Sequence, residues 1–342
     1  MDQYDQDTLL QAHYATLSAF WESALERTGY CAILLSAGQQ RFFFHDDQGP
    51  AFRPNPLLVQ WLAQEKISEN SWFVFSQGAK PTLLFHQPDD FWHAATVAPN
   101  QLKDHLTLKV FSDLTALHAA LDKHLKQIRG SQQEIAQISE DSPPAAAGCV
   151  INPGNVIHAL HFQRACKTEY ELAIMRDASL RGAKGHKAAQ RAFSEGASEF
   201  AIHLAFLEAT GMNEWQLPYA NIIAQNQHAG LLHYQYQDRE VGEHLNSLLI
   251  DAGANVDGYA SDITRTYIGP RCYSQEAADL FSELLARMQT HQDALIDRVV
   301  PGANYVDLQA AMHQSLAAML VDTGILKCGP EEAFTKELTV PF

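Results

Sequence analysis

Two aspartates lie where a β-hairpin would place acidic side chains beside an apolar core. They are Asp251 and Asp262, in the segment SLLIDAGANVDGYASDITRTY over residues 247–267. Asp257-Gly258 between them favours a tight turn. Because paired residues share a face and faces alternate along a strand, a register with an even-length loop directs both carboxylates to one side. Two half-buried carboxylates within reach of each other are unfavourable unless a cation or a proton lies between them.

The aspartate spacing has two interpretations, and spacing alone does not separate them. Either side chain can point to solvent at the mouth of a loop, where aspartate is common. Alternatively, both carboxylates bind cations, and their hard oxygens suit Mg²⁺, Mn²⁺ or Ca²⁺ better than a thiophilic metal. Two such ligands can hold a pair of ions, an arrangement that activates water for hydrolysis.

His233 is the histidine that we place nearest to this chemistry. It lies in AGLLHYQYQ, residues 229–237, which we expect to form a strand beside the hairpin. The ordinary interpretation is a packed histidine whose ring nitrogens are satisfied. The functional interpretation is a neutral imidazole that donates a hydrogen bond to bound substrate. Composition does not decide between them.

The elements that must position these residues fall into two sets. Residues 1–158 alternate helix and strand signals and predict an α/β domain. The expected elements are a helix over 12–30, strands over 31–38 and 41–45, a hairpin over 71–86 and a helix over 113–128 with Asp113 as its N-cap. Residues 159–342 predict helices beside an antiparallel sheet, an α+β domain. In this part, Thr168 and Glu171 have the spacing of a capping box. A strand is expected over 219–225, one helix is expected to begin near Ser274, and another is expected from Tyr305 to Leu320.

Composition limits the classes of partner. The 342 residues carry 24 basic and 40 acidic side chains, a net charge of −16, which argues against nucleic acid and anionic membranes. No apolar run has the length of a membrane span. The five cysteines are scattered and form no CxxC pair, which is typical of reduced thiols, so we expect a cytoplasmic protein. No GxGxxG, Walker, GxSxG or HExxH motif is present.

The hairpin segment closely resembles the first metal-ligand motif of the pita-bread metallopeptidases, D-A-G-A…G-Y-A-x-D-x-T-R-T. The similarity extends along nearly the whole chain. CKTEYELAIMRDASLRGAKGHKAA resembles the helix that opens the catalytic domain of that family, and LPYANIIAQNQHAGLLHY resembles its histidine-bearing segment. FHDDQGPAFRPNP and KPTLLFHQPDDFWHA are similar to the bacterial Xaa-Pro dipeptidase branch. The implied fold is an α/β N-terminal domain followed by an α+β pita-bread catalytic domain.

The resemblance implies a site and a reaction. Asp251 and Asp262 would bind two divalent ions, in this family usually Mn²⁺, and His233 would contact the substrate. Tyr219 would line the substrate pocket, and Asp47 would reach the pocket of the partner subunit in a homodimer. The implied substrate is a dipeptide with a C-terminal proline. Activity on organophosphate esters is a side reaction of this branch that we do not predict for this chain.

One departure from the family bears on activity. The sequence stops at KELTVPF, before the segments in which relatives supply a histidine ligand and two glutamates. We therefore expect a C-terminally incomplete pita-bread domain, a fragment of a longer gene product that is inactive by itself. Two alternatives stay open: a non-catalytic binding or scaffold protein of the same fold, and a creatinase-like amidinohydrolase that uses no metal. Retention of both aspartates disfavours the second.

Overall fold

The computed structural model describes residues 3–63, 66–92, 96–129, 133–140 and 148–340. The chain divides into two compact units. The first comprises Met1–Gly185, Leu207–Ala220 and Ala252–Ile263, and the second comprises His186–Phe206, Asn221–Asp251 and Thr264–Phe342. Among the described residues, no helix combines the length and the apolar character needed to cross a bilayer.

The first unit is built on a six-stranded mixed sheet in the order β4-β3-β2-β1-β5-β6. Its strands are β1 (Ala32–Ser36), β2 (Trp72–Ser76), β3 (Thr82–His86), β4 (Thr107–Phe111), β5 (Ile135–Ile138) and β6 (Cys149–Ile151). The pairs β1–β2 and β2–β3 are antiparallel, and β3–β4, β1–β5 and β5–β6 are parallel. The hairpin expected over 71–86 is therefore confirmed.

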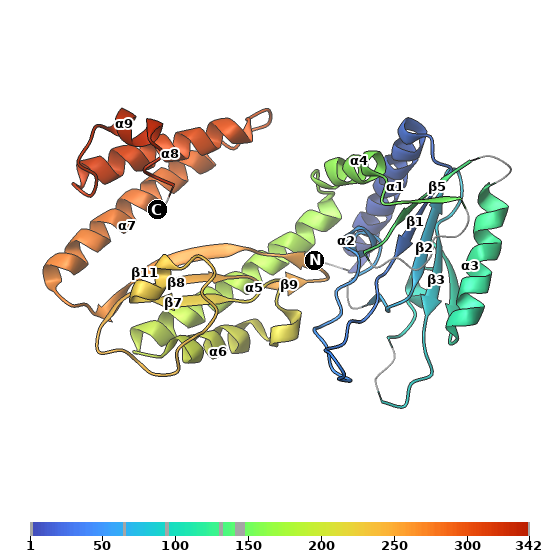
Figure 1. The fold of residues 1–342 in the computed structure, drawn as a ribbon, viewed down its shortest axis with the longest axis horizontal. Helices are drawn as coiled ribbons and strands as arrows, with labels where there is room; N and C mark the ends of the chain where they lie inside the picture. Colours follow the sequence, from blue (N-terminus) through green and yellow to red (C-terminus); the bar gives the residue numbers. More distant parts are fainter. Residues whose placement is uncertain (1–2, 64–65, 93–95, 130–132, 141–147, 341–342) are drawn as a thin grey trace. The chain divides into compact units, whose positions relative to one another are not determined.

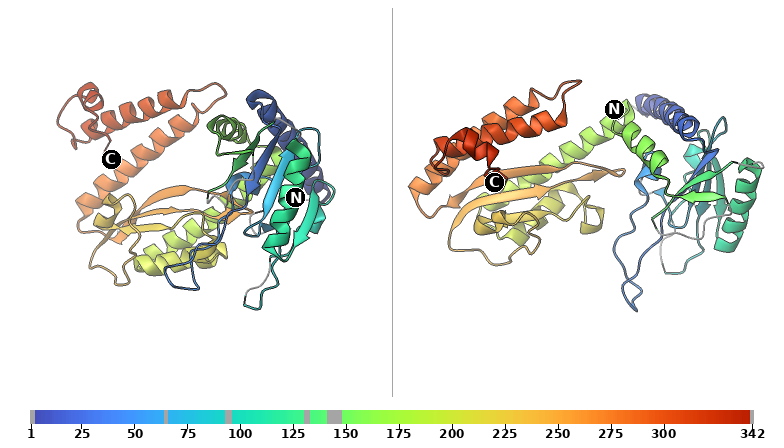
Figure 2. Two further views of the ribbon diagram at one scale, coloured as in Figure 1. Left: turned by 45° about the vertical axis from the view of Figure 1, so that its right-hand side comes forward. Right: turned by 45° about the horizontal axis from the view of Figure 1, so that its top comes forward.

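Helices cover both faces of this sheet (Figures 1 and 2). They are α1 (Gln3–Thr28), α2 (Pro56–Val59) and α4 (Gly154–Arg164) on one face and α3 (Leu114–Arg129) on the other. Because side chains alternate along β1, Ile33 and Leu35 pack with the first set, whereas Leu34 packs against α3. The fold class expected for this part, α/β, follows from these two apolar layers.

Local signals fix the ends of these helices. Gly29 has φ +81° directly after α1, a conformation that glycine adopts without a steric penalty. The Asp113 carboxylate accepts a hydrogen bond from the Ala116 backbone N–H at 2.6 Å, so the expected N-cap of α3 is confirmed.

The strand expected over 41–45 is wrong. The chain makes a turn there, in which the Phe43 backbone N–H donates to the Gln48 carbonyl at 2.8 Å. The side chains of Phe42, Phe43 and Phe44 are 58–92% exposed. Aromatic residues favour strands only where a neighbouring strand and a packed face receive them, and this segment has neither among the described residues.

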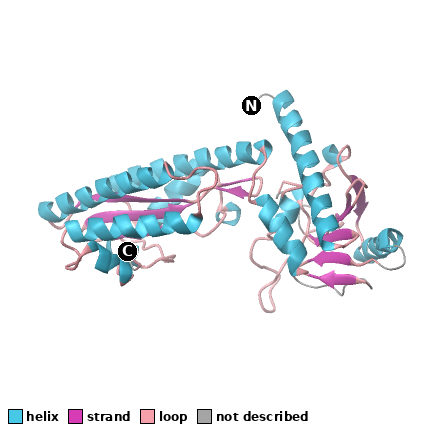
Figure 3. Cartoon of the chain, turned by 90° about the horizontal axis from the view of Figure 1, so that it is seen from above, coloured by secondary structure: helices cyan, strands magenta, loops and turns pink. Residues whose placement is uncertain are grey.

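The second unit contains most of a three-stranded sheet in the order β11-β8-β7. Its strands are β7 (Ile222–Gln225), β8 (Leu245–Ala252) and β11 (Ile263–Arg271), with β7 antiparallel to β8. Helix α6 (Glu199–Thr210) lies along one face of this sheet (Figure 1), and its Ile202 and Phe206 are completely buried. Figure 3 shows helices alongside the strands of this unit. Helices beside an antiparallel pair agree with the α+β class expected here.

Three helices follow in the second unit: α7 (Gln275–Ile296), α8 (Tyr305–Asp322) and α9 (Pro330–Thr335). The Ser274 hydroxyl accepts the Ala277 backbone N–H at 3.1 Å, which confirms the expected start of α7. Leu316, Met319 and Leu320 of α8 form a small apolar cluster against which Leu284 of α7 packs.

A buried polar network fastens the start of α5 (Glu169–Ser194) within the first unit. Thr168 and Glu171 form the expected capping box, with hydrogen bonds of 2.8 and 3.3 Å between side chain and backbone. The Glu171 carboxylate, 1% exposed, also accepts from the Tyr259 hydroxyl at 2.8 Å and from Gln60 Nε2 at 3.2 Å. His13 Nδ1 bonds the Thr168 hydroxyl at 2.8 Å. Burial raises the pKa of Glu171, but the hydrogen bonds from Thr168, Tyr259 and Gln60 outweigh it and hold that pKa below its usual value.

Glu171→Gln tests this network. An amide cannot accept all three hydrogen bonds, so we expect the free energy of unfolding at pH 7 to fall by about 1–3 kcal/mol. Since the folded pKa is lowered, the stabilisation is present above the unfolded value of 4.5 and is lost as the pH falls through the folded value. The difference between variant and wild type should therefore shrink below pH 4.5 in urea titrations followed by circular dichroism. Glu169→Gln, in the same first turn but exposed, is the control, and a difference independent of pH would contradict the account.

Candidate active site

The segment between β8 and β11 contains a second, smaller hairpin. Strands β9 (Asn255–Val256) and β10 (Tyr259–Ala260) pair with Val256 opposite Tyr259. Asp257 and Gly258 form the turn with φ values of 51° and 90°. Two consecutive positive φ angles are what a type I′ turn requires, so the turn expected from Asp257-Gly258 is confirmed. Asp262 follows this hairpin, immediately before β11.

Asp262 and Tyr219 are brought together in the first unit. The Tyr219 hydroxyl donates to Asp262 Oδ1 at 2.9 Å. Asp262 is exposed and Tyr219 is half-buried. A hydroxyl donor on one carboxylate oxygen fixes the orientation of that carboxylate, as partners outside the ligand shell do in metal sites. The sequence resemblance assigned both residues to one site, but it gave no contact between them.

Close packing behind Asp262 depends on Gly253. A Cβ atom there would lie 2.0 Å from the Ser261 carbonyl oxygen and 3.0 Å from the Tyr219 ring. Ser261 is 4% exposed, and its hydroxyl accepts the Ala254 backbone N–H at 3.0 Å. The glycine of the D-A-G-A motif therefore allows the segment that carries Ser261 and the Tyr219 ring to pack closely against residue 253.

Arg53 supports the segment that carries Tyr219. Its guanidinium donates to the Leu217 carbonyl at 3.0 Å and to the Pro218 carbonyl at 2.8 Å. A planar guanidinium can donate to two neighbouring oxygens at once, which restrains both peptide groups together. The sequence analysis did not single out Arg53, because one arginine in a proline-containing loop gives no local signal of a contact 164 residues away.

Asp251 lies near the end of β8 in the second unit, opposite Ile222 of β7. It is half-buried, between Ile250 and Ala252, which are both fully buried. The strand expected here is confirmed, and it places a carboxylate among apolar neighbours. Its role as a metal ligand stays a prediction.

His233 does not lie on a strand, so that expectation is wrong. After a 3₁₀ helix, η4 (Asn226–Gly230), the chain runs as an irregular loop. His233 is exposed, as are Leu231 and Leu232 at 55% and 88%. The alternation of apolar and polar residues in AGLLHYQYQ is typical of a strand. Instead, hydrogen bonds from Tyr234 and other loop residues hold this segment as an irregular loop.

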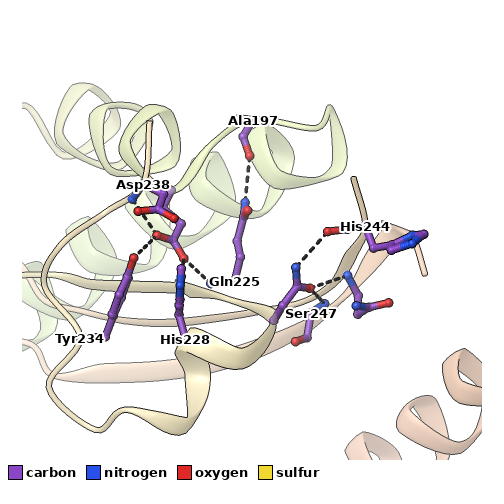
Figure 4. Close-up of polar contacts among 10 residues, drawn as sticks. Ala197, Gln225, His228, Tyr234, Asp238, His244 and Ser247 are labelled. Atoms are coloured by element: carbon purple, nitrogen blue, oxygen red, sulfur yellow. Dashed lines mark hydrogen bonds and ion pairs between the residues drawn. The ribbon is translucent and has the colours of Figure 1, made fainter. Parts of the chain in front are cut away.

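Those anchors converge on Glu199, at the start of α6, which is 1% exposed (Figure 4). Glu199 Oε1 accepts from the Gln225 backbone N–H at 2.7 Å and from His228 Nδ1 at 2.8 Å. Glu199 Oε2 accepts from the Tyr234 hydroxyl at 2.7 Å and from the Asp238 backbone N–H at 2.8 Å. Burial, together with the hydrogen bond to Glu199, raises the pKa of Tyr234.

The sequence analysis missed this cluster, because glutamate in the first turn of a helix is common and usually exposed. Glu199, His228 and Asp238 are residue types that bind metals, and one ligand atom of each lies within 4.8 Å of the others. Four hydrogen bonds to the Glu199 carboxylate nevertheless account for its burial without an ion.

Asp47 lies in the first unit, in the turn that follows Phe43, and it is exposed. The neighbouring Asp46 carboxylate accepts the Gln48 backbone N–H at 3.0 Å, which stabilises that turn. The role of Asp47 therefore stays a prediction from the resemblance.

Comparisons with known proteins place the chain in a family. The family model "Xaa-Pro dipeptidase, N-terminal domain" matches residues 8–162, and that of "Metallopeptidase family M24" matches residues 173–338. An Xaa-Pro dipeptidase of Stenotrophomonas maltophilia is 35% identical over 100% of this chain and 74% of its own length. One from Xanthomonas campestris pv. campestris is 36% identical over 100% of this chain and 75% of its own length.

Solved structures resemble the fold at lower identity. Aminopeptidase PepP of Pseudomonas aeruginosa has a TM-score of 0.74 and 18% identity over 99% of this chain and 77% of its own. Aminopeptidase P from E. coli with the inhibitor Pro-Leu has a TM-score of 0.71 and 17% identity over 100% and 78%.

The protein belongs to metallopeptidase family M24, the family of the bacterial Xaa-Pro dipeptidases. The resemblance drawn from the sequence and the expected fold class are both confirmed. Members of this family are metallohydrolases, and carboxylates such as Asp251 and Asp262 are suitable ligands for divalent ions.

Gly253→Ala tests the packing behind Asp262. The added methyl cannot fit beside the Ser261 carbonyl, so the backbone must shift, and we expect a loss of about 1–3 kcal/mol in unfolding free energy. If Asp262 binds a divalent cation, the affinity for that cation, measured by isothermal titration, should also fall because the backbone shift disturbs the contact between Tyr219 and Asp262. Gly154→Ala, where no atom lies within 4 Å of the new Cβ, is the matched control. Wild-type stability and affinity in Gly253→Ala would refute the packing argument.

Proposed function

We propose that the protein hydrolyses dipeptides of the form Xaa-Pro in a metal-dependent reaction. The observation that carries the proposal is the 35–36% identity, over the whole chain, to proteins named Xaa-Pro dipeptidases. The solved aminopeptidases are only 16–18% identical, so they support the fold and not the substrate. Retention of both motif aspartates, with Tyr219 bonded to one of them, favours a hydrolase over a scaffold of the same fold.

Asp251 and Asp262 are proposed to bind two divalent ions, with Mn²⁺ as the physiological metal. Anionic oxygen ligands offset the charge of two dications and suit Mn²⁺. The chemistry that such ions supply when bound is activation of a water molecule for attack on the scissile carbonyl. Tyr219 holds the Asp262 carboxylate through its 2.9 Å hydrogen bond, and it lines the pocket for the substrate.

His233 is proposed to contact the substrate and to stabilise the negative charge that develops on its carbonyl oxygen. An imidazole N–H can supply such a hydrogen bond. The exposure of His233 on its loop leaves the ring accessible to a small ligand. A cytoplasmic location is proposed on the five free cysteines, which form no disulfide.

Asp262→Ala should abolish metal-dependent turnover and preserve the fold, because Asp262 is exposed and its removal leaves no buried cavity. The protein would be assayed on Gly-Pro and Leu-Pro with Mn²⁺, with and without a chelator, and the variant would be examined by circular dichroism. Asp279→Ala, an exposed aspartate on α7, is the control and should retain activity. Wild-type turnover in Asp262→Ala would exclude the metal role.

The same assay, extended by an amidino substrate, separates the competing functions. A scaffold protein hydrolyses none of these substrates, and a creatinase-like amidinohydrolase cleaves only the amidino substrate, with or without the chelator.

A homodimer in which Asp47 reaches the pocket of the partner subunit is also proposed. Asp47 is exposed and lies in a turn, so Asp47→Ala should leave the thermal stability unchanged. We expect kcat/KM for Leu-Pro to fall while light scattering still reports a dimer. Asp89→Ala, another aspartate of the first unit, is the control. A monomeric wild type, or unchanged kinetics in Asp47→Ala, would refute this arrangement.

A further inference from the structure

The loop that carries His233 is closed at its base by Asn226. The Asn226 side chain donates from Nδ2 to the His244 carbonyl at 2.9 Å and accepts the Asn246 backbone N–H at 2.8 Å (Figure 4). Asn226 has φ +52°, a left-handed conformation that asparagine tolerates, so the chain turns sharply as it leaves β7. Residues 226–244 thereby form one loop with adjoining ends, which we name the histidine loop.

Apolar packing does little to hold the outer part of the histidine loop. Leu232 and Tyr236, on either side of His233 in the sequence, are 88% and 82% exposed. Tyr234 is the exception at 4%, and its ring stacks on that of His228 with centroids 4.4 Å apart. Tyr234 also forms a small apolar cluster with Ile222 and Ala224 of β7. Beyond that cluster, the exposed outer part of the loop depends on specific polar contacts for a defined path.

Glu199 supplies these contacts from outside the loop. His228, Tyr234 and Asp238 all donate to its carboxylate, at 2.7–2.8 Å. These three residues lie before, directly beside and after His233 in the sequence. A carboxylate can only accept, so His228 Nδ1 must be the donor in its pair. Charged acceptors make the stronger hydrogen bonds, and a buried charge that loses its donors is costly.

We propose that Glu199 is a positioning residue that fixes the path of the histidine loop and thereby sets the place of His233 against the substrate. The proposal rests on the substrate-contacting role of His233 in the proposed function. It assigns a role in catalysis to a side chain at the start of α6 that acts only through the loop.

The primary variant is Glu199→Gln, which keeps the shape of the side chain but replaces one acceptor oxygen by a donor. Two of the four donors then face an NH₂ group, and the loop loses its fixed path. We expect kcat/KM for Leu-Pro to fall by about 10- to 100-fold, the range typical of partners that orient active-site groups. Glu208→Gln, on the exposed face of α6, is the matched control and should retain wild-type kinetics.

Tyr234→Phe is a second, milder variant that tests the same contact if Glu199→Gln fails to fold. It removes one hydrogen bond and keeps the ring that stacks on His228, so we expect about a fivefold loss of kcat/KM. Hydrogen–deuterium exchange provides a readout independent of activity. The backbone amides of Gln225 and Asp238 donate to Glu199 and should exchange faster in Glu199→Gln but not in Glu208→Gln.

A double-mutant cycle with His233→Ala decides whether Glu199 acts through His233. If it does, Glu199→Gln lowers kcat/KM by less than about twofold once His233 is absent, because residues coupled through one backbone segment give non-additive effects. Additive losses, or an unaffected Glu199→Gln enzyme, overturn the inference while leaving the proposed function intact. An active wild type in which His233→Ala has no effect overturns the inference and the role of His233, but not the hydrolase. A wild type without Xaa-Pro hydrolysis overturns the proposed function, and the inference with it.

Discussion

Acidic side chains inside an apolar protein need a compensating group, and this chain provides it in two ways. Glu171 and Glu199 are each 1% exposed, and donors from several segments surround them. In both cases the satisfied carboxylate joins residues that are far apart in the sequence, up to 111 positions for the Gln60–Glu171 pair. Burying these charges is favourable only when every donor is in place. Each carboxylate therefore favours the native arrangement over folds in which a donor is missing. Asp251 is half-buried and Asp262 is exposed, and the compensation proposed for this pair is two bound cations.

The contrast between the two kinds of carboxylate explains their local sequence. Glu171 lies in the capping box at the start of α5, and Glu199 lies in the first turn of α6. At both helix starts, the free backbone N–H groups and the helix dipole favour a negative charge. Asp262 instead follows a tight hairpin and is held by one hydroxyl, that of Tyr219. The role proposed for Asp262 requires lone pairs that can be donated to a metal, and a single orienting hydrogen bond leaves such lone pairs available.

Much of the fold follows from signals within a few residues of each other. The cap at Asp113, the capping box at Thr168 and the turn at Asp257-Gly258 involve contacts across one to three residues, and all three are confirmed. The two wrong strands, over 41–45 and 229–237, are apolar runs whose form depends on distant partners. A strand needs a neighbouring strand to complete its backbone hydrogen bonds. A local sequence pattern does not indicate whether such a strand lies beside it. The motif identified the two aspartates, but the contacts of Arg53 and Glu199 became visible only in three dimensions.

The irregular path of the histidine loop is consistent with a role in binding. A strand would commit the backbone of residues 229–237 to the sheet and alternate its side chains between two faces. The observed loop exposes Leu231, Leu232 and His233 together, which a strand would not allow. Because a buried carboxylate holds the base of the loop, the apolar side chains at the tip of the loop need not be buried to fix its path. These exposed side chains are therefore available for a ligand. Binding residues often lie on loops held by a rigid scaffold, and here the first turn of α6 serves as that scaffold.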